Sequence, residues 1–148
     1  MKRVILVLLF IFILGASWYA YHLYTGKVKS LNLVDADVTL SAASLVEAFQ
    51  KDSADANKKY LGKVISLNGM VKVVEPESST IVLGDSTSNW SIRCSMDSNY
   101  VNVVGTFKPG NVLHIKGNCT GFLPDDLGLG SDIVLNRCVI ESNSTTDQ

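Results

Sequence analysis

After Gly62 the chain leaves a helical spacing of apolar residues and begins to alternate apolar with polar residues. Alternation with a period of two predicts strands that bury one face and expose the other. The pattern recurs in five segments separated by turn residues such as Pro, Gly, Asn and Asp. These segments are residues 63–75, 80–83, 90–96, 113–119 and 133–140. The sequence therefore predicts a mainly β domain with five short strands.

Five strands grouped as three and then two are too few for a seven-stranded sandwich. They match the five-stranded OB-fold barrel, and Gly69 in the middle of the long first strand suits the bend that a small barrel requires. A partly open sheet with a helix across one face is the alternative. We expect this OB-fold domain to occupy residues 41–141.

Ahead of the strands, residues 41–61 predict one amphipathic α-helix with Ser41 as its N-cap and Gly62 as its stop. The residues that form its apolar stripe recur at intervals of three and four. They are Ala42, Leu45, Val46, Phe49, Ser53, Ala56 and Tyr60.

The first residues predict an N-terminal transmembrane helix. Val4 to Tyr24 carries no charged residue, and Lys2 and Arg3 precede it, which places the N-terminus in the cytoplasm. A cleaved signal peptide is the alternative. Either way we expect an extracytoplasmic domain, periplasmic in a bacterium, with residues 1–24 as a single-pass membrane anchor, 25–40 as a linker and 142–148 as a disordered tail.

Charge and histidine content exclude several classes of function. Beyond the apolar run there are 11 basic residues against 14 acidic ones, which is the wrong balance for strong phosphate binding. His114 is the only histidine there, so a four-ligand zinc site cannot be assembled. A Ser-His-Asp set would also have to use His114, and the sequence has no G-x-S-x-G nucleophile elbow. Cys94 and His114 are the only other candidate nucleophile and base. The alternation places Cys94 on the inward face of its strand and His114 on the outward face of its own strand, so we expect the two side chains to lie apart. We expect no enzyme activity, no metal and no cofactor.

Three cysteines in an exported domain suggest one disulfide and one free thiol. Cys119 and Cys138 lie on the last two predicted strands and are the candidate pair, with two buried thiols as the alternative. Cys94 shares the apolar side of its strand and is expected to be a buried, unreactive thiol.

Two sets of side chains are candidates for ligand binding. Lys72, Arg93 and Lys116 could form a modest basic patch, with Phe122 as a residue on which a base would stack. Asp125 and Asp126 lie in the loop before the last strand, and this loop and the loop after the first strand, Glu75 to Ser79, flank the binding face of OB-folds. Both loops are acidic in this chain. Asp125 and Asp126 could hold calcium together with Asp132, but a solvated acidic turn explains them as well.

Four segments resemble the tRNA_anti-like family of bacterial OB-fold proteins. They are ANKKYLGKVISLNG (56–69), IRCSM (92–96), FKPGNVLHIKGNCTGFL (107–123) and DIVLNRCVI (132–140). The resemblance implies an OB-fold domain over roughly residues 41–141, exported and without an assigned activity. This chain lacks the lipid-anchoring cysteine of lipoprotein members.

We expect a membrane-anchored binding module for a protein, peptide or glycan partner, acting through the outer barrel face and its two acidic loops. The first alternative is an exported domain that binds single-stranded nucleic acid. The second is a structural subunit of an envelope complex.

Overall fold

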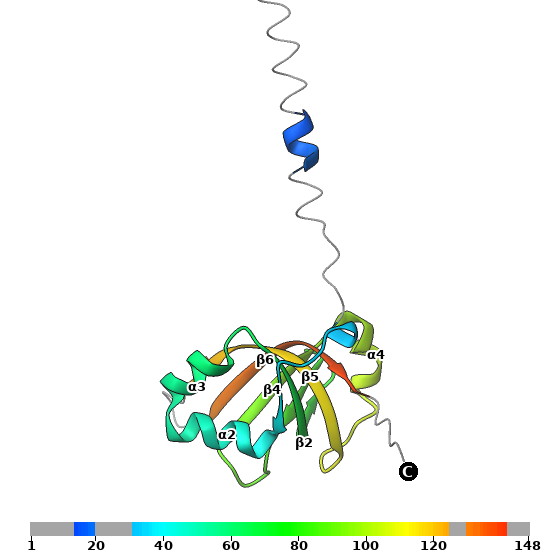
Figure 1. The fold of residues 1–148 in the computed structure, drawn as a ribbon. Helices are drawn as coiled ribbons and strands as arrows, with labels where there is room; N and C mark the ends of the chain where they lie inside the picture. Colours follow the sequence, from blue (N-terminus) through cyan, green and yellow to red (C-terminus); the bar gives the residue numbers. More distant parts are fainter. Residues whose placement is uncertain (1–13, 20–30, 125–129, 142–148) are drawn as a thin grey trace, which may run out of the picture.

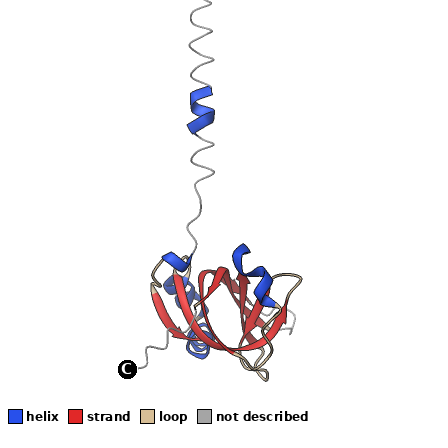
Figure 2. Cartoon of the chain, turned by 90° about the vertical axis from the view of Figure 1, so that its right-hand side faces the viewer, coloured by secondary structure: helices blue, strands red, loops and turns tan. Residues whose placement is uncertain are grey.

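The computed structural model describes residues 14–19, 31–124 and 130–141. Its centre is a closed barrel of five strands, which Figure 2 shows curving around the core. The strands are β2 (Val64–Glu75), β3 (Thr80–Leu83), β4 (Trp90–Met96), β5 (Val112–Leu123) and β6 (Ser131–Ile140). They run in the order β2-β3-β4-β6-β5, and β5 pairs again with β2 to close the barrel. Only the β4–β6 pairing is parallel in this ring. The predicted five-stranded OB-fold barrel is confirmed.

A sixth strand lies in the segment that we expected to be a linker, so that expectation is wrong for residues 31–40. Residues Leu31–Leu33 form a short 3-10 helix, η1, and β1 (Val38–Ser41) pairs in parallel with β2. Asp37 holds the start of β1 beside the start of β2. Its backbone N–H donates to the Val64 carbonyl oxygen, and its carboxylate accepts from the Val64 N–H, both at 2.8 Å. A four-residue strand is too short to show a clear alternation.

The predicted helix over residues 41–61 is divided into α2 (Ala42–Lys51) and α3 (Ser53–Tyr60). Ser41 caps α2 as expected, with its hydroxyl oxygen accepting from the Ser44 N–H at 3.1 Å. Asp52 breaks the helix: its backbone is extended, and its carboxylate accepts from the Asp55 N–H at 3.0 Å. The side chain of Asp52 thus starts a new helix, as N-cap aspartates do.

The helices lie at opposite ends of the barrel (Figure 1). Leu45 and Phe49 of α2 and Tyr60 of α3 close one end and are almost fully buried. At the other end, the segment between β4 and β5 contains the 3-10 helix η2 (Ser98–Tyr100) and the short α4 (Val101–Val104), where we expected a loop. Val104 of α4 is fully buried, so this helix also joins the core.

The inward residues of all five barrel strands meet in one apolar core. Burial of such side chains contributes most of the stabilisation of a domain of this size. Those with no measurable exposure are Ile65, Leu67, Ile81, Leu83, Ile92, Cys94, Ile115, Cys119, Ile133, Leu135 and Cys138.

Gly69 marks the point where β2 changes partners and α2 crosses it. Residues up to Asn68 pair with β1, and residues from Val71 pair with β3. A Cβ atom on Gly69 would lie 2.6 Å from the Cβ of Ala42, the first residue of α2. The glycine therefore allows the helix to pack directly on the strand.

Some predictions fall outside the described residues. Most of the predicted transmembrane segment, residues 25–30 of the linker, the tail 142–148, and Asp125 and Asp126 belong to this group. Residues 14–19 form a helix. Within the described ranges, no helix has both the length and the apolar character to span a bilayer.

Substituting Gly69→Ala is expected to destabilise the domain by about 1–3 kcal/mol, since the new methyl group must displace Ala42 and the helix that carries it. Gly105→Ala is the matched control, because nothing lies within 4 Å of its added Cβ and its φ of −67° suits alanine. Urea unfolding of the two variants measures the difference. Equal midpoints would show that the Gly69–Ala42 contact does not restrict α2.

Candidate binding groove

Arg93 lies at the centre of the barrel face on which OB-folds bind ligands, on the strand between β3 and β6. Its Nη1 is 3.1 Å from Glu75 Oε2, and its Nε is 3.4 Å from Asp132 Oδ2. The guanidinium is therefore shared between a carboxylate on the adjacent strand β6 and one at the end of β2, two strands away. This predicted ligand-binding cation is already neutralised within the chain.

Lys72 is also engaged inside the domain. It is the extra residue where the β2–β3 register shifts between Val71 and Val73. Its Nζ donates to the carbonyl oxygen of Ser88 at 2.6 Å and to Ser91 Oγ at 3.1 Å. The lysine thus ties β2 to the β3–β4 connection and does not extend freely into solvent.

Lys116 lies apart from the other two, on β5 between β2 and β6, and it is 7% exposed. Its Nζ is 3.0 Å from Glu141 Oε1, and the Ser66 hydroxyl donates to the same carboxylate. Burial opposes ionisation of Glu141, but hydrogen bonds from Ser66 and Lys116 and the charge of Lys116 outweigh it, so the pKa of Glu141 lies below its ordinary value. A buried, paired lysine is part of the structure and not a contact for phosphate.

Phe122, the predicted stacking residue, is half-buried and packs between two other aromatic rings. Its ring centroid is 5.4 Å from that of Trp90, with the planes 11° apart, and 5.4 Å from that of Phe49. Phe122 therefore links β5 to α2 and β4. The rings of Trp90 and Phe49 already occupy the positions next to Phe122 at which a base would stack.

The predicted basic patch consequently does not form as a single free surface. Lys72 and Arg93 lie on the β2–β4 side, and Lys116 lies on β5. Of the two acidic loops, residues Glu75–Ser78 line a shallow hollow in which Glu75 is held by Arg93. Asp125 and Asp126 of the other loop are outside the described residues, and Asp132 is paired with Arg93.

The two cysteines of the predicted disulfide pair are not bonded in the structure. Cys119 lies opposite Leu135 in the β5–β6 register, three positions before Cys138, and both thiols are free and buried. Cys94 is also a buried free thiol, as expected. His114 is half-exposed on β5.

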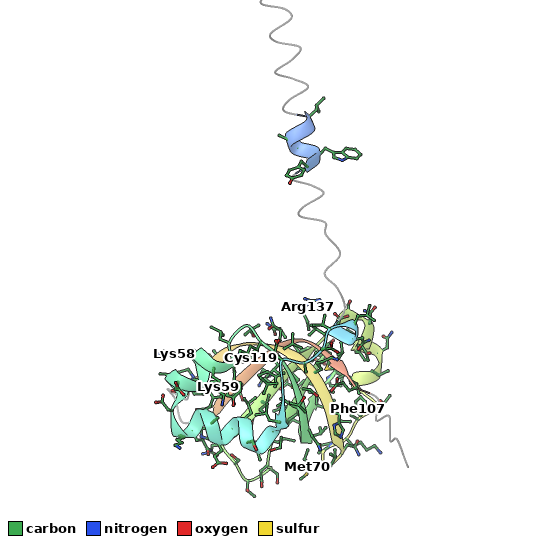
Figure 3. The ribbon with its side chains drawn as sticks, viewed as in Figure 1. Lys58, Lys59, Met70, Phe107, Cys119 and Arg137 are labelled. Carbon is green, nitrogen blue, oxygen red and sulfur yellow. The ribbon has the colours of Figure 1, made fainter. Side chains whose placement is uncertain are left out.

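The described domain has a groove of about 460 Å³ that no sequence pattern indicated. It lies where the end of β1 and the start of α2 face the β3–β4 connection across β2. Figure 3 places Met70, one of its residues, at the edge of the domain. The groove is lined by Ser41, Ala42, Ala43, Val46, Gln50, Asn68, Gly69, Met70, Gly84, Asp85, Ser88 and Trp90.

Apolar side chains form part of this groove and polar ones surround them. Met70 is 51% exposed, and Trp90 is half-exposed beside it, with one ring face stacked on Phe122. Ser41, Gln50, Asn68 and Ser88 supply neutral hydrogen-bonding groups. An apolar patch with a few polar groups around it is typical of a binding site.

Asp85 is the one charged residue among those that line the groove, all of which lie in the described part of the chain. The backbone N–H and the hydroxyl of Thr87 each donate to Asp85 Oδ1 at 2.7 Å. These hydrogen bonds lower the pKa of Asp85 from its ordinary value of 3.8, so the carboxylate is ionised at neutral pH. The groove therefore contains one negative charge, and the charge of the nearby Lys72 also helps to lower the pKa of Asp85.

Sequence reasoning missed this groove because its residues come mainly from α2, β2 and the β3–β4 connection, which the strand pattern does not relate to one another. The available signals were two glycines. Gly69 interrupts β2 beside Met70, and Gly84 precedes Asp85 at the end of β3. A mid-strand glycine can mark a close approach of another backbone, but it does not identify which segment approaches.

The Lys116–Glu141 pair makes stability depend on pH. Because the folded pKa of Glu141 is lowered from 4.5, its contribution is present above about pH 5 and is lost as the pH falls through the lowered value. We expect Lys116→Met to cost about 1 kcal/mol at neutral pH and to flatten the loss of stability between about pH 6 and pH 3. Urea unfolding across this range measures it, with Lys108→Met, at an exposed lysine, as the control. Identical pH profiles for Lys116→Met and the unchanged chain would contradict the assignment.

Comparison with known proteins identifies the family. No curated protein matches the sequence. A crystal structure of a "putative nucleic acid-binding lipoprotein" from Klebsiella pneumoniae subsp. pneumoniae MGH 78578 superposes with a TM-score of 0.53 at 17% identity, over 70% of this chain and 91% of that one. A "putative aspartyl-tRNA synthetase" from Leishmania major Friedlin gives 0.47 at 9% identity, over 89% of this chain and 27% of that one. The family model tRNA_anti-like matches residues 1–140. With most of its length matched and an OB-fold at its centre, the chain belongs to the tRNA_anti-like family.

Proposed function

We propose that this protein is a non-catalytic binding module, held at the outer side of a membrane by its N-terminal segment, and that it binds a short peptide segment of a partner protein in the groove beside α2. The groove itself carries the proposal. It combines exposed apolar side chains, neutral polar groups and a single carboxylate in one concavity of about 460 Å³.

The chemistry of the groove suits an extended peptide. The first N–H groups of a helix have no partner within the helix, and Ala42 and Ala43 at the start of α2 line one side of the groove. Carbonyl oxygens of a peptide backbone can accept from such groups. An apolar side chain of the ligand would contact Met70 and Trp90, and a Lys or Arg side chain would lie near Asp85.

Membrane attachment is supported by the sequence. The uncharged stretch Val4–Tyr24 follows Lys2 and Arg3, which is the arrangement of a signal anchor. Only six residues, 25–30, separate Tyr24 from Leu31, the first buried residue of the domain. A partner bound by this module would therefore be one that is itself close to the membrane surface.

Nucleic acid is the second candidate ligand, and the name of the Klebsiella relative is the reason to test it. Against it, Arg93 is neutralised by Glu75 and Asp132, and Lys116 by Glu141. Phosphate-driven binding depends on cations that can exchange their counterions. The groove offers a carboxylate in their place.

Peptide selection followed by titration tests the proposal. The full-length chain in lipid nanodiscs would be screened against displayed random peptides, and occupancy would be read from the fluorescence of Trp90 in a Trp18→Phe background. We expect Met70→Ser to weaken binding of the selected peptides about 5–10-fold, because about 1 kcal/mol of apolar contact is lost. Val73→Ser is the matched control: it changes an exposed apolar residue of β2 outside the groove.

Two further measurements and the comparison of Met70→Ser with its control make the result decisive. Asp85→Asn should weaken peptides that contain Lys or Arg and leave neutral ones unchanged. Equal effects of Met70→Ser and Val73→Ser would place the ligand elsewhere. Oligonucleotide binding that falls steeply between about 50 and about 200 mM salt and is lost in Arg93→Gln would replace the proposal with the nucleic-acid function.

A further inference from the structure

Two of the three buried thiols lie on adjacent strands inside the barrel. Cys94 is on β4 and Cys138 is on β6, and both have no measurable exposure. The two strands are parallel, with Cys94 opposite Leu135 and Met96 opposite Cys138. The register therefore shifts between these pairs, because two residues of β4 span the same length as three of β6.

The extra residue in β6 turns the Cys138 side chain inward. In a regular strand Leu135 and Arg137 would share one face and Cys138 would point the other way. Arg137 instead has a φ of +56°, a left-handed conformation that is typical of a bulge. After this bulge Cys138 faces the core as Leu135 does.

Gly117 on β5 provides the space that the inward thiol needs. A Cβ atom on this glycine would lie 2.5 Å from Cys138 Sγ and 3.2 Å from the Leu135 Cβ. The sulfur of Cys138 thus fills the space that a side chain at position 117 would need.

The register brings the two thiols into the same part of the core: Cys94 lies opposite Leu135, and Leu135 Cβ and Cys138 Sγ both lie against the backbone of Gly117. Hydrogen bonding with the Cys94 thiol raises the pKa of Cys138 well above its ordinary value, and burial raises it further. For Cys119 the raised pKa has a different cause, which is burial. Its thiol interacts with the backbone of Gly121 and not with either of the other two thiols.

We propose that Cys94 and Cys138 form a disulfide that joins β4 to β6 when the domain folds in a thiol-oxidising compartment, and that Cys119 stays a free thiol. Two S–H bonds are lost and one S–S bond forms. The two electrons and two protons pass to an exchangeable disulfide, of an oxidoreductase or of glutathione, which leaves as two thiols. Because both sulfurs are buried in the folded domain, the exchange takes place before β6 completes the barrel.

This proposal needs the outward location proposed above but not the peptide ligand. A disulfide in an exported domain removes conformational freedom from the unfolded chain, and in the chain-entropy model its stabilisation grows with the logarithm of the length of the segment it closes. Here that segment contains α4 and β5 and ends in the last strand, so the bond would hold the barrel closed.

The test counts thiols in the full-length chain after refolding with reduced and oxidised glutathione. The chain is denatured, alkylated without reduction and digested for mass spectrometry. We expect one alkylated cysteine, Cys119, and one linked peptide pair containing Cys94 and Cys138. Three alkylated cysteines, or a bond that includes Cys119, would overturn the proposal. Since these outcomes do not depend on peptide binding, they are distinct from a failure of the proposed function.

Two variants provide a second readout. Reduction should lower the melting temperature of the unchanged chain and of Cys119→Ser by at least about 10 °C. The melting temperature of Cys94→Ser should not respond to reduction, because the bond cannot form. If Cys94→Ser does not fold, the thiol count of Cys119→Ser decides: no alkylated cysteine supports the pair, and two alkylated cysteines reject it.

Discussion

The contact between Gly69 and Ala42 fixes how the parts of the molecule are arranged. It holds the start of α2 against β2 at the place where the strand exchanges β1 for β3 as its partner. From there α2 and α3 run across one end of the barrel and bury Phe49 and Tyr60. The same contact leaves a space between the helix start and the β3–β4 connection, and this space is the groove. The close packing of α2 on β2 therefore has two results: the helices cover one end of the barrel, and the groove stays open beside them.

Charges on the barrel are largely balanced within the domain. Arg93 joins three strands through Glu75 and Asp132, and Lys116 joins β5 to the residue that follows β6. OB-folds that bind nucleic acid present cationic side chains to the phosphates. In this chain, Arg93 and Lys116 are instead paired with carboxylates of the domain itself. Membership of the family and its fold thus leave the ligand open, because function depends on the site and not on the architecture. In this chain the groove beside α2 has a different chemistry from the barrel face.

Alternation of apolar and polar residues predicts the five barrel strands well, because each strand buries one face and exposes the other. It does not predict where that alternation is interrupted. Asp52 ends one helix and begins another through a single side-chain hydrogen bond, and β1 is too short to carry a period. Arg137 reverses the parity of β6, so Cys138 could not be assigned to the core from its spacing. The basic candidates were placed on the correct strands, but the carboxylates that bind them are distant in sequence.

The position of β6 in the chain has a consequence for biosynthesis. This strand is the last element of the fold, and it pairs with both β4 and β5. A polypeptide made from its amino end therefore cannot complete its hydrogen-bonded ring until β6 has left the ribosome. Until then the interior of the nascent domain remains accessible to solvent and to folding factors.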